Sequence, residues 1–128
     1  MIDSILSAEN LDEAEVVFLL AAYEKTASSR KGTVKGPGAV IDMLDTKVEL
    51  FNREYKTETS KKIKIGKSDL GDISNFSPEE ALKMITNECG KLSDKFVFLL
   101  GGEHSVSLGS LQALAKKFDP KDVTILHI

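Results

Sequence analysis

The sequence has too few cysteine and histidine residues for several common classes of small protein. Cys89 is the single cysteine among 128 residues, so no disulfide can form within the chain, and disulfide-stapled secreted scaffolds are excluded. Two histidines and one cysteine also fall short of the four ligands of a structural zinc site built from Cys and His. The cytoplasm is the expected location, and any metal must rely on carboxylates or on residues outside this chain.

The sequence also lacks a basic excess and a long apolar run. Its 17 Lys and Arg residues against 20 Asp and Glu residues give a net charge of −3, whereas nucleic-acid-binding domains usually carry a basic excess. The longest apolar run, residues 16–22, is far shorter than the roughly 20 residues of a membrane span. We therefore expect neither nucleic acid nor membrane as a partner, and the length suits one domain at most.

The apolar residues gather in runs that are typical of strands buried on both faces of a parallel sheet. These runs are residues 15–22, 95–100 and 123–128. Briefer strands are predicted at residues 48–51 and 63–65, with polar loops at 24–38 and 52–62.

Three helices are predicted between these runs. One is opened by Pro37 and ends near Thr46, and one begins at the S-P-E-E sequence of residues 77–80, which combines an N-cap serine, a first-turn proline and a capping-box glutamate. The last carries Leu108, Leu111, Leu114 and Phe118 on one stripe and stops at Asp119-Pro120. Alternating strands and helices predict an α/β fold with a mainly parallel sheet.

The most promising chemical group is Glu103-His104-Ser105, on the turn between a predicted strand and helix. Gly101 and Gly102 precede it and allow a tight bend close to a ligand. The surrounding residues do not fit a phosphate-binding P-loop or a dinucleotide-binding glycine pattern, because the required glycines are missing. A serine nucleophile elbow fits poorly for the same reason.

Four stretches in order along the chain resemble the ureohydrolases, the arginase and agmatinase family. Residues 98–109 are similar to the family's GG[DE]HS segment, residues 23–33 with Gly36-Pro37 to the agmatinase loop after the first strand, and residues 69–73 to a D-x-G-D-I turn. Residues 125–128 resemble the strand that leads into the family's D-A-H-x-D motif. The resemblance spans residues 15–128 and implies a three-layer α/β/α fold, truncated after the strand that ends at Ile128.

The resemblance also implies a chemistry and one site residue. Members of the family use two Mn²⁺ ions and a shared hydroxide to release urea from a guanidino substrate. By position, His104 is the Mn²⁺ ligand that the GG[DE]HS segment contributes, and Glu103 has at most a supporting role. Neither the D-A-H-x-D motif nor the later aspartate motif, which hold the other ligands, is present. One imidazole cannot hold two divalent ions that prefer several oxygen ligands, so the isolated chain is expected to be inactive.

Other polar residues have simpler structural interpretations. His127 falls within a predicted strand rather than on a ligand position, and Asp69 and Asp72 are expected to bond local backbone in a turn. Cys89 is expected in the core. The basic residues of the loop at 24–38 are expected to be exposed; they are Lys25, Arg30, Lys31 and Lys35.

We therefore interpret residues 1–128 as the N-terminal part of a single ureohydrolase-like domain, most similar to agmatinases, which convert agmatine to putrescine and urea. Arginine or guanidinobutyrate is the alternative substrate, and the complete protein is expected to form a homo-oligomer. The alternative from another class is a non-catalytic fragment or half-chain that associates with a partner. An uncovered face and edge of an unfinished sheet would serve as the association surface.

Overall fold

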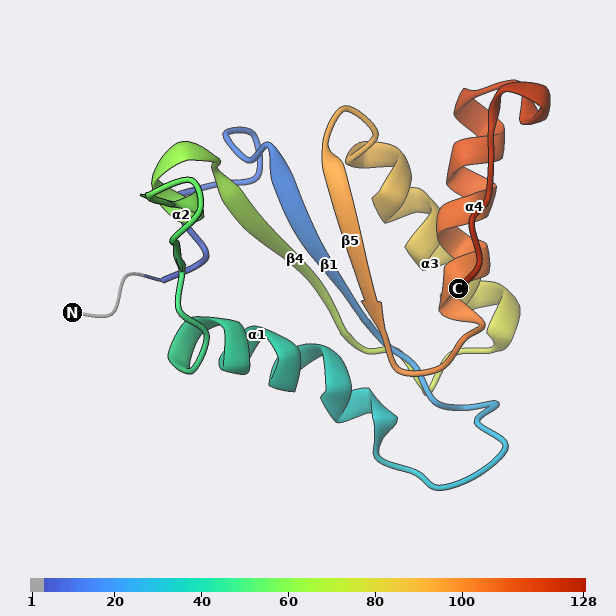
Figure 1. The fold of residues 1–128 in the computed structure, drawn as a ribbon. Helices are drawn as coiled ribbons and strands as arrows, with labels where there is room; N and C mark the ends of the chain where they lie inside the picture. The colour runs from blue at the N-terminus through green and yellow to red at the C-terminus, as the bar shows by residue number, and fades with distance from the viewer. Residues whose placement is uncertain (1–3) are drawn as a thin grey trace.

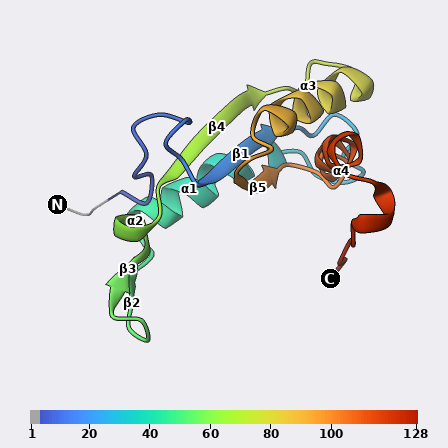
Figure 2. The same ribbon diagram turned by 90° about the horizontal axis from the view of Figure 1, so that it is seen from above.

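The computed structural model describes residues 4–128 and is built around a sheet of three parallel strands. The strands are β4 (Ile65–Asp72), β1 (Val16–Ala22) and β5 (Phe96–Gly101), in the order β4-β1-β5 with β1 in the centre (Figure 1). Helices α3 (Pro78–Lys91) and α4 (Val106–Lys117) pack on one face, and α1 (Gly36–Thr46) lies on the other side (Figure 2). The predicted α/β fold with a parallel sheet is confirmed.

The core lies between the sheet and the α3–α4 pair. Val17, Leu19 and Ala21 alternate along β1, and all three are fully buried in one cluster with Ile85 of α3 and Val106 of α4. Burying an aliphatic side chain of this size contributes about 1.5–3 kcal/mol. The apolar run at residues 15–22 thus forms the central strand, as its composition predicts.

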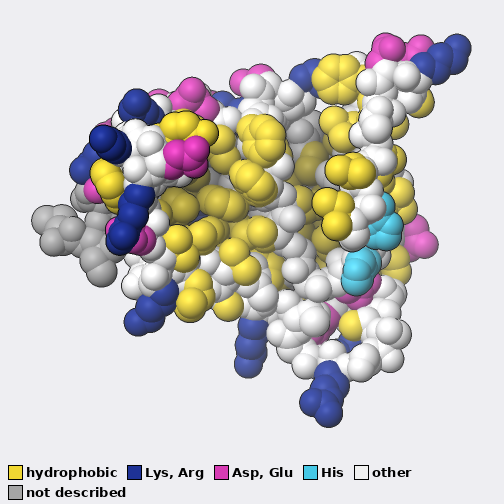
Figure 3. All heavy atoms as spheres, in the orientation of Figure 1, with side chains coloured by type: hydrophobic (Ala, Val, Ile, Leu, Met, Phe, Trp, Pro, Cys, Tyr) yellow, Lys and Arg dark blue, Asp and Glu magenta, His cyan; other side chains and the backbone are white. Residues whose placement is uncertain are grey.

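The opposite face of the sheet, which we call the front face, is largely uncovered beside β5. Phe96 is 63% exposed and Phe98 is 48% exposed, and the ring of Phe98 stacks on Phe18 at 5.5 Å between centroids. Figure 3 shows the resulting apolar surface over the middle of the sheet. Helix α1 buries Ile41 on this side of the molecule but leaves the phenylalanines open.

Helix α3 begins where the sequence predicts. The Ser77 hydroxyl accepts a hydrogen bond from the Glu80 amide, and the Glu80 carboxylate accepts one from the Ser77 amide, at 3.3 and 2.9 Å. This capping box satisfies two amides that a bare helix end would leave without partners. Cys89 faces the core from the same helix, as expected, and burial raises the pKa of its thiol.

The segment between α1 and β4 differs from the prediction. Instead of a strand at residues 48–51 and a loop at 52–62, a small hairpin pairs β2 (Phe51–Asn52) with β3 (Thr57–Glu58), and α2 (Thr59–Lys62) follows. The brief strand predicted at residues 63–65 is instead the eight-residue β4. Polar residues such as Lys67 and Asp69 hide this strand from a search for apolar runs.

The prediction of a third buried strand at residues 123–128 is wrong. A 3-10 turn at Pro120–Asp122 is capped by Asp119, whose carboxylate accepts from the Lys121 amide at 3.0 Å. Beyond it the chain does not join the sheet, and Figure 2 shows its end leading away from α4. Ile125, Leu126 and Ile128 are all exposed. An apolar run becomes a strand only when its backbone pairs with a neighbour, and this run has no ladder partner within residues 4–128.

Candidate functional site

His104 lies at the carboxyl end of the parallel sheet, which is where open α/β sheets place working residues. It stands on the turn between β5 and α4 and is exposed. Gly102 makes this turn possible, because a Cβ there would collide with the backbone carbonyl of Tyr23 at the end of β1. The turn therefore sits directly against the central strand.

Glu103 connects the His104 turn by hydrogen bonds to Tyr23 and to the loop after β1. Its amide donates to the Tyr23 carbonyl at 3.1 Å, and its Oε1 accepts hydrogen bonds from Ser105 Oγ at 2.6 Å and from Thr26 Oγ1. Ser105 belongs to the turn, whereas Thr26 belongs to the loop after β1. One carboxylate thus links the two segments that flank the candidate metal ligand.

Tyr23, whose carbonyl accepts the hydrogen bond from the Glu103 amide, is itself a buried residue. The side chain is 2% exposed, and its hydroxyl and the Oε2 of Glu103 are buried without a hydrogen-bond partner within residues 4–128. Burial raises the pKa of the Tyr23 hydroxyl, with smaller contributions from the negative charges of Glu103 and Glu79. The hydroxyl therefore stays protonated and can donate a hydrogen bond.

Glu24 organises the long loop between β1 and α1. Its Oε2 accepts from the Gly32 amide at 2.6 Å, and from the Thr33 hydroxyl and the Val34 amide at 3.3 Å each. These bonds, the Gly32 amide first, lower the pKa of the Glu24 carboxyl. Gly32 has a φ of 119°, a conformation that side-chain-bearing residues rarely adopt. The loop is therefore built around one carboxylate.

Asp69 and Asp72 lie at the end of β4 and accept hydrogen bonds from nearby backbone amides. Asp69 Oδ1 accepts from the Gly71 amide at 2.8 Å, and Asp72 Oδ1 accepts from the Ser74 amide at 2.9 Å. The bond from the Ser74 amide is the main cause of the lowered pKa of Asp72. Both carboxylates therefore bond local backbone, as expected, but the prediction that residues 69–72 form a turn is wrong, because they belong to strand β4.

The residues present do not form a metal site on their own. His104 lines a shallow hollow of about 220 Å³ with Glu103 and Ser107, but residues 4–128 contain no group of three or more His, Cys, Asp or Glu side chains placed to hold an ion. His127, expected inside a strand, is instead exposed in the C-terminal segment. At this turn the described residues thus offer the single imidazole of His104, on a turn held by Glu103.

Comparison with known proteins identifies the family. The model of the arginase family matches residues 14–128, nearly the whole chain. The chain belongs to the arginase family. It is 33% identical to an agmatinase of Bacillus anthracis, covering 97% of this chain and 42% of that protein. It is 30% identical to an N(1)-aminopropylagmatine ureohydrolase of Synechocystis, covering 81% of this chain and 36% of that protein.

Solved structures of the family agree with the fold. The formiminoglutamase of Trypanosoma cruzi, crystallised with Mn²⁺, superposes with a TM-score of 0.75 at 27% identity and covers 93% of this chain and 40% of that one. The arginase-family chain thus spans about two fifths of the length of the relatives that it matches. Within residues 4–128, no helix is long and apolar enough to cross a membrane.

Sequence reasoning singled out His104 and Glu103 but missed the structural roles of Tyr23, Glu24 and Thr26 in the segments around them. The polar composition of residues 24–38 predicts a loop and says nothing about its internal bonds. One signal was available: a lone acidic residue directly after a buried strand, followed eight positions later by a glycine. Such a carboxylate can accept the loop's backbone amides.

Proposed function

We propose that this chain is the N-terminal part of a manganese-dependent ureohydrolase that hydrolyses agmatine to putrescine and urea. The observation that carries the proposal is the position of His104 at the carboxyl end of β5, held against β1 through Glu103, in a chain that belongs to the arginase family. The identity to an agmatinase over 97% of the chain favours agmatine as the substrate.

His104 supplies one neutral imidazole nitrogen to a Mn²⁺ ion in this proposal. Imidazole together with carboxylate oxygens suits Mn²⁺. The ion, when bound, would supply the hydroxide that the reaction needs, because a guanidinium carbon is a poor electrophile. The role of Glu103 is to fix the turn, since its Oε1 already accepts from Ser105 and Thr26. This chain contributes a positioned ligand, and the other ligands lie outside it.

Several substrates are alternatives to agmatine. The names of the relatives include agmatinase, N(1)-aminopropylagmatine ureohydrolase and formiminoglutamase, and arginine and guanidinobutyrate remain alternatives from the sequence. The test compares five substrates by kcat/KM: agmatine, N(1)-aminopropylagmatine, arginine, guanidinobutyrate and formiminoglutamate. The product measured is urea or, with formiminoglutamate, formamide. A preference for a substrate other than agmatine would contradict the choice made here.

The test uses the chain with and without the rest of a family domain. We expect the 128-residue chain with Mn²⁺ to release no urea, and the chain joined to the C-terminal part of the Bacillus anthracis agmatinase to release it. In the joined protein, His104→Ala should reduce both bound Mn²⁺ and turnover, whereas His127→Ala should leave both near the parent values. Unchanged metal content in His104→Ala would contradict its assignment as a ligand.

The second candidate is a non-catalytic half-chain that associates with a partner, in a cytoplasmic setting. The exposed phenylalanines of the front face favour association. The two candidates are separated by the nucleotide sequence after the Ile128 codon. An in-frame continuation that encodes D-A-H-x-D favours the enzyme, and a stop codon favours the half-chain. For the complete enzyme we also propose a homo-oligomer, which light scattering after size-exclusion chromatography tests.

A further inference from the structure

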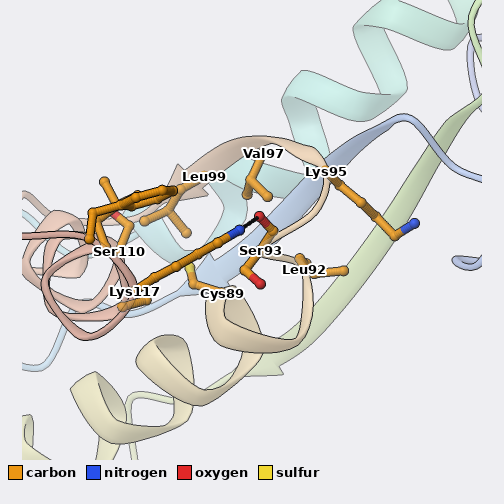
Figure 4. A pocket seen from close by; sticks show the side chains of 11 residues that line it. Cys89, Leu92, Ser93, Lys95, Val97, Leu99, Ser110 and Lys117 are labelled. Atoms are coloured by element: carbon orange, nitrogen blue, oxygen red, sulfur yellow. Dashed lines mark hydrogen bonds between the residues drawn. The ribbon is translucent and has the colours of Figure 1, made fainter. Parts of the chain in front are cut away.

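The lysines that line the cleft between β5 and α4 show how polar groups are usually accommodated in this chain (Figure 4). Lys117 Nζ donates a hydrogen bond to the Ser93 carbonyl. Lys95, whose side chain is 10% exposed, donates from Nζ to the Ala14 carbonyl at 2.9 Å. Buried polar groups in proteins are nearly always hydrogen-bonded in this way, so a buried polar atom without a partner needs an explanation.

Four side-chain oxygens within residues 4–128 are buried without a hydrogen-bond partner. Two of them, in Glu58 and Ser60, lie at the start of α2, where Oε2 of Glu58 forms an ion pair with Lys61 at 2.8 Å. The other two are the hydroxyl of Tyr23 and Oε2 of Glu103, the residue before His104. A buried polar atom that lacks a hydrogen bond destabilises the folded state, so this second pair points to an interaction.

The Tyr23 hydroxyl and the Glu103 carboxylate are complementary as donor and acceptor. A phenol can donate one hydrogen bond, whereas an ionised carboxylate only accepts. The backbones of the two residues are already joined, because the Glu103 amide donates to the Tyr23 carbonyl at 3.1 Å. The side chains lie near each other as well, since the charge of Glu103 raises the pKa of the Tyr23 hydroxyl, after the larger effect of burial.

Glu79 is the competing acceptor for the Tyr23 hydroxyl. Its negative charge also raises the pKa of Tyr23, with a smaller contribution than that of Glu103. Glu79 lies in the first turn of α3 and is exposed, so solvent can satisfy its carboxylate. Oε2 of Glu103 is buried and has no such alternative. A hydrogen bond from Tyr23 therefore stabilises the fold more at Glu103 than at Glu79.

A bond at Oε2 completes the contacts that hold the His104 turn. Oε1 of Glu103 accepts from Ser105 and from Thr26, and both of these residues are exposed, so water competes for their hydroxyls. Tyr23 directly follows β1 and is 2% exposed. Its hydroxyl is therefore a donor that solvent does not reach and that the core holds in place.

We propose that Tyr23 is a positioning residue for His104. The Tyr23 hydroxyl donates to Oε2 of Glu103, directly or through one water molecule, and so fixes the carboxylate that holds the turn. A water can bridge two polar atoms that do not touch each other. The hydrogen bond is testable in this chain alone, whereas its consequence for metal binding rests on the proposed function, which assigns His104 as a Mn²⁺ ligand.

Tyr23→Phe tests the hydrogen bond, because it removes only the hydroxyl and keeps the buried ring. We expect the equilibrium constant for folding of the 128-residue chain, measured by urea denaturation, to fall about tenfold or more, as for a hydrogen bond to a charged group. A buried hydroxyl without a partner would give the opposite sign, since its removal stabilises the folded state. Tyr55→Phe is the matched control, because the chain's other tyrosine is 72% exposed and should not affect the constant.

A double-mutant cycle identifies the acceptor of this hydrogen bond. In a Glu103→Ala background the hydroxyl has lost its acceptor, so Tyr23→Phe should no longer lower the folding constant. In a Glu79→Ala background the loss should persist. Circular dichroism verifies that each variant keeps the parent fold. NMR cross-relaxation between the Tyr23 ring and a long-lived water separates a water bridge from a direct bond, and either result supports the proposal.

His104 reports whether the hydrogen bond positions the turn. The NMR signals of its ring should shift in Tyr23→Phe and stay in place in Tyr55→Phe. In the chain joined to the C-terminal part of the Bacillus anthracis agmatinase, Tyr23→Phe should weaken Mn²⁺ binding about tenfold, as is typical of residues that support a metal ligand. The KM for agmatine should not change, and excess Mn²⁺ should restore kcat. A purely structural role would leave the Mn²⁺ affinity of the folded variant unchanged.

Three results would overturn the proposal. They are a folding constant that rises or stays the same in Tyr23→Phe, a loss that disappears in Glu79→Ala rather than in Glu103→Ala, and His104 signals that do not move. The proposed function fails separately, because a joined protein that releases no urea contradicts the activity, while the measurements on the 128-residue chain still decide the role of Tyr23.

Discussion

Gly102→Ala is the substitution that tests most directly how His104 is positioned. A Cβ at residue 102 would collide with the carbonyl oxygen of Tyr23 and lie 3.0 and 3.2 Å from its carbonyl carbon and amide nitrogen. All three are backbone atoms of Tyr23, the residue directly after the central strand, so no side-chain rotation can make room. Overpacking typically costs about 1–3 kcal/mol, and we expect about 2 kcal/mol or more because the turn must lift away from β1.

Gly90→Ala is the control for this prediction. Gly90 lies in α3 with no atom within 4 Å of an added Cβ, so alanine should raise the free energy of unfolding by about 0.5–1 kcal/mol through helix propensity. Urea denaturation followed by circular dichroism measures the free energy of unfolding of Gly102→Ala and of Gly90→Ala. The NMR signals of the His104 ring should shift in Gly102→Ala and stay in place in Gly90→Ala. Equal unfolding midpoints for Gly102→Ala and the parent would refute the close approach.

Three further predictions concern the scaffold. Ser77→Ala should lower the free energy of unfolding by about 1 kcal/mol through loss of the N-cap, measured by urea denaturation; no loss would contradict the capping box. Ile85→Ala should cost about 2–5 kcal/mol because the side chain is fully buried, and a cost below about 1 kcal/mol would show that the core is loose there. The pKa of Glu24 is held below its ordinary value of 4.5, so the bonds that it accepts are present above that pH and lost as the pH falls through the lowered pKa. The protection factor of the Gly32 amide, which compares its exchange rate with that of an unstructured amide at the same pH, should therefore fall in acid, and Glu24→Gln should remove this pH dependence.

The parts of the fold that the sequence predicts are those set by short-range signals. The start of α3 depends on hydrogen bonds between Ser77 and Glu80, three residues apart. The strands β1 and β5 are both apolar runs, as predicted, but β5 lies at the edge of the sheet with Phe96 and Phe98 exposed, so the prediction that it is buried on both faces is wrong. The His104 turn follows from two glycines between such a strand and a helix. Each of these features is decided within a few residues.

The parts that escape prediction depend on partners distant in sequence. β4 is a strand because it pairs with β1, which lies far away along the chain, in a register that sets Gly66 opposite Val17, and a Cβ at residue 66 would press on Ala14. Residues 123–128 fail to form a strand for the converse reason: their composition suits one, but no ladder partner lies beside them in the part of the chain described. Burial and pairing, rather than apolar content, decide both cases.

The loop after β1 and the His104 turn behave as one structural unit. Glu24 draws the far end of the loop back to β1 through the Gly32 amide, and Glu103 joins the near end to the turn through Thr26. In each carboxylate one oxygen makes these bonds, Oε1 in Glu103 and Oε2 in Glu24, while Oε2 of Glu103 is buried without a partner within residues 4–128. Glu103 therefore holds the turn that carries His104, and Glu24 holds the loop that Glu103 contacts through Thr26. In the metal centre proposed for this chain, the further ligands would therefore come from outside residues 4–128, where no group of three His, Cys, Asp or Glu side chains is placed to hold an ion.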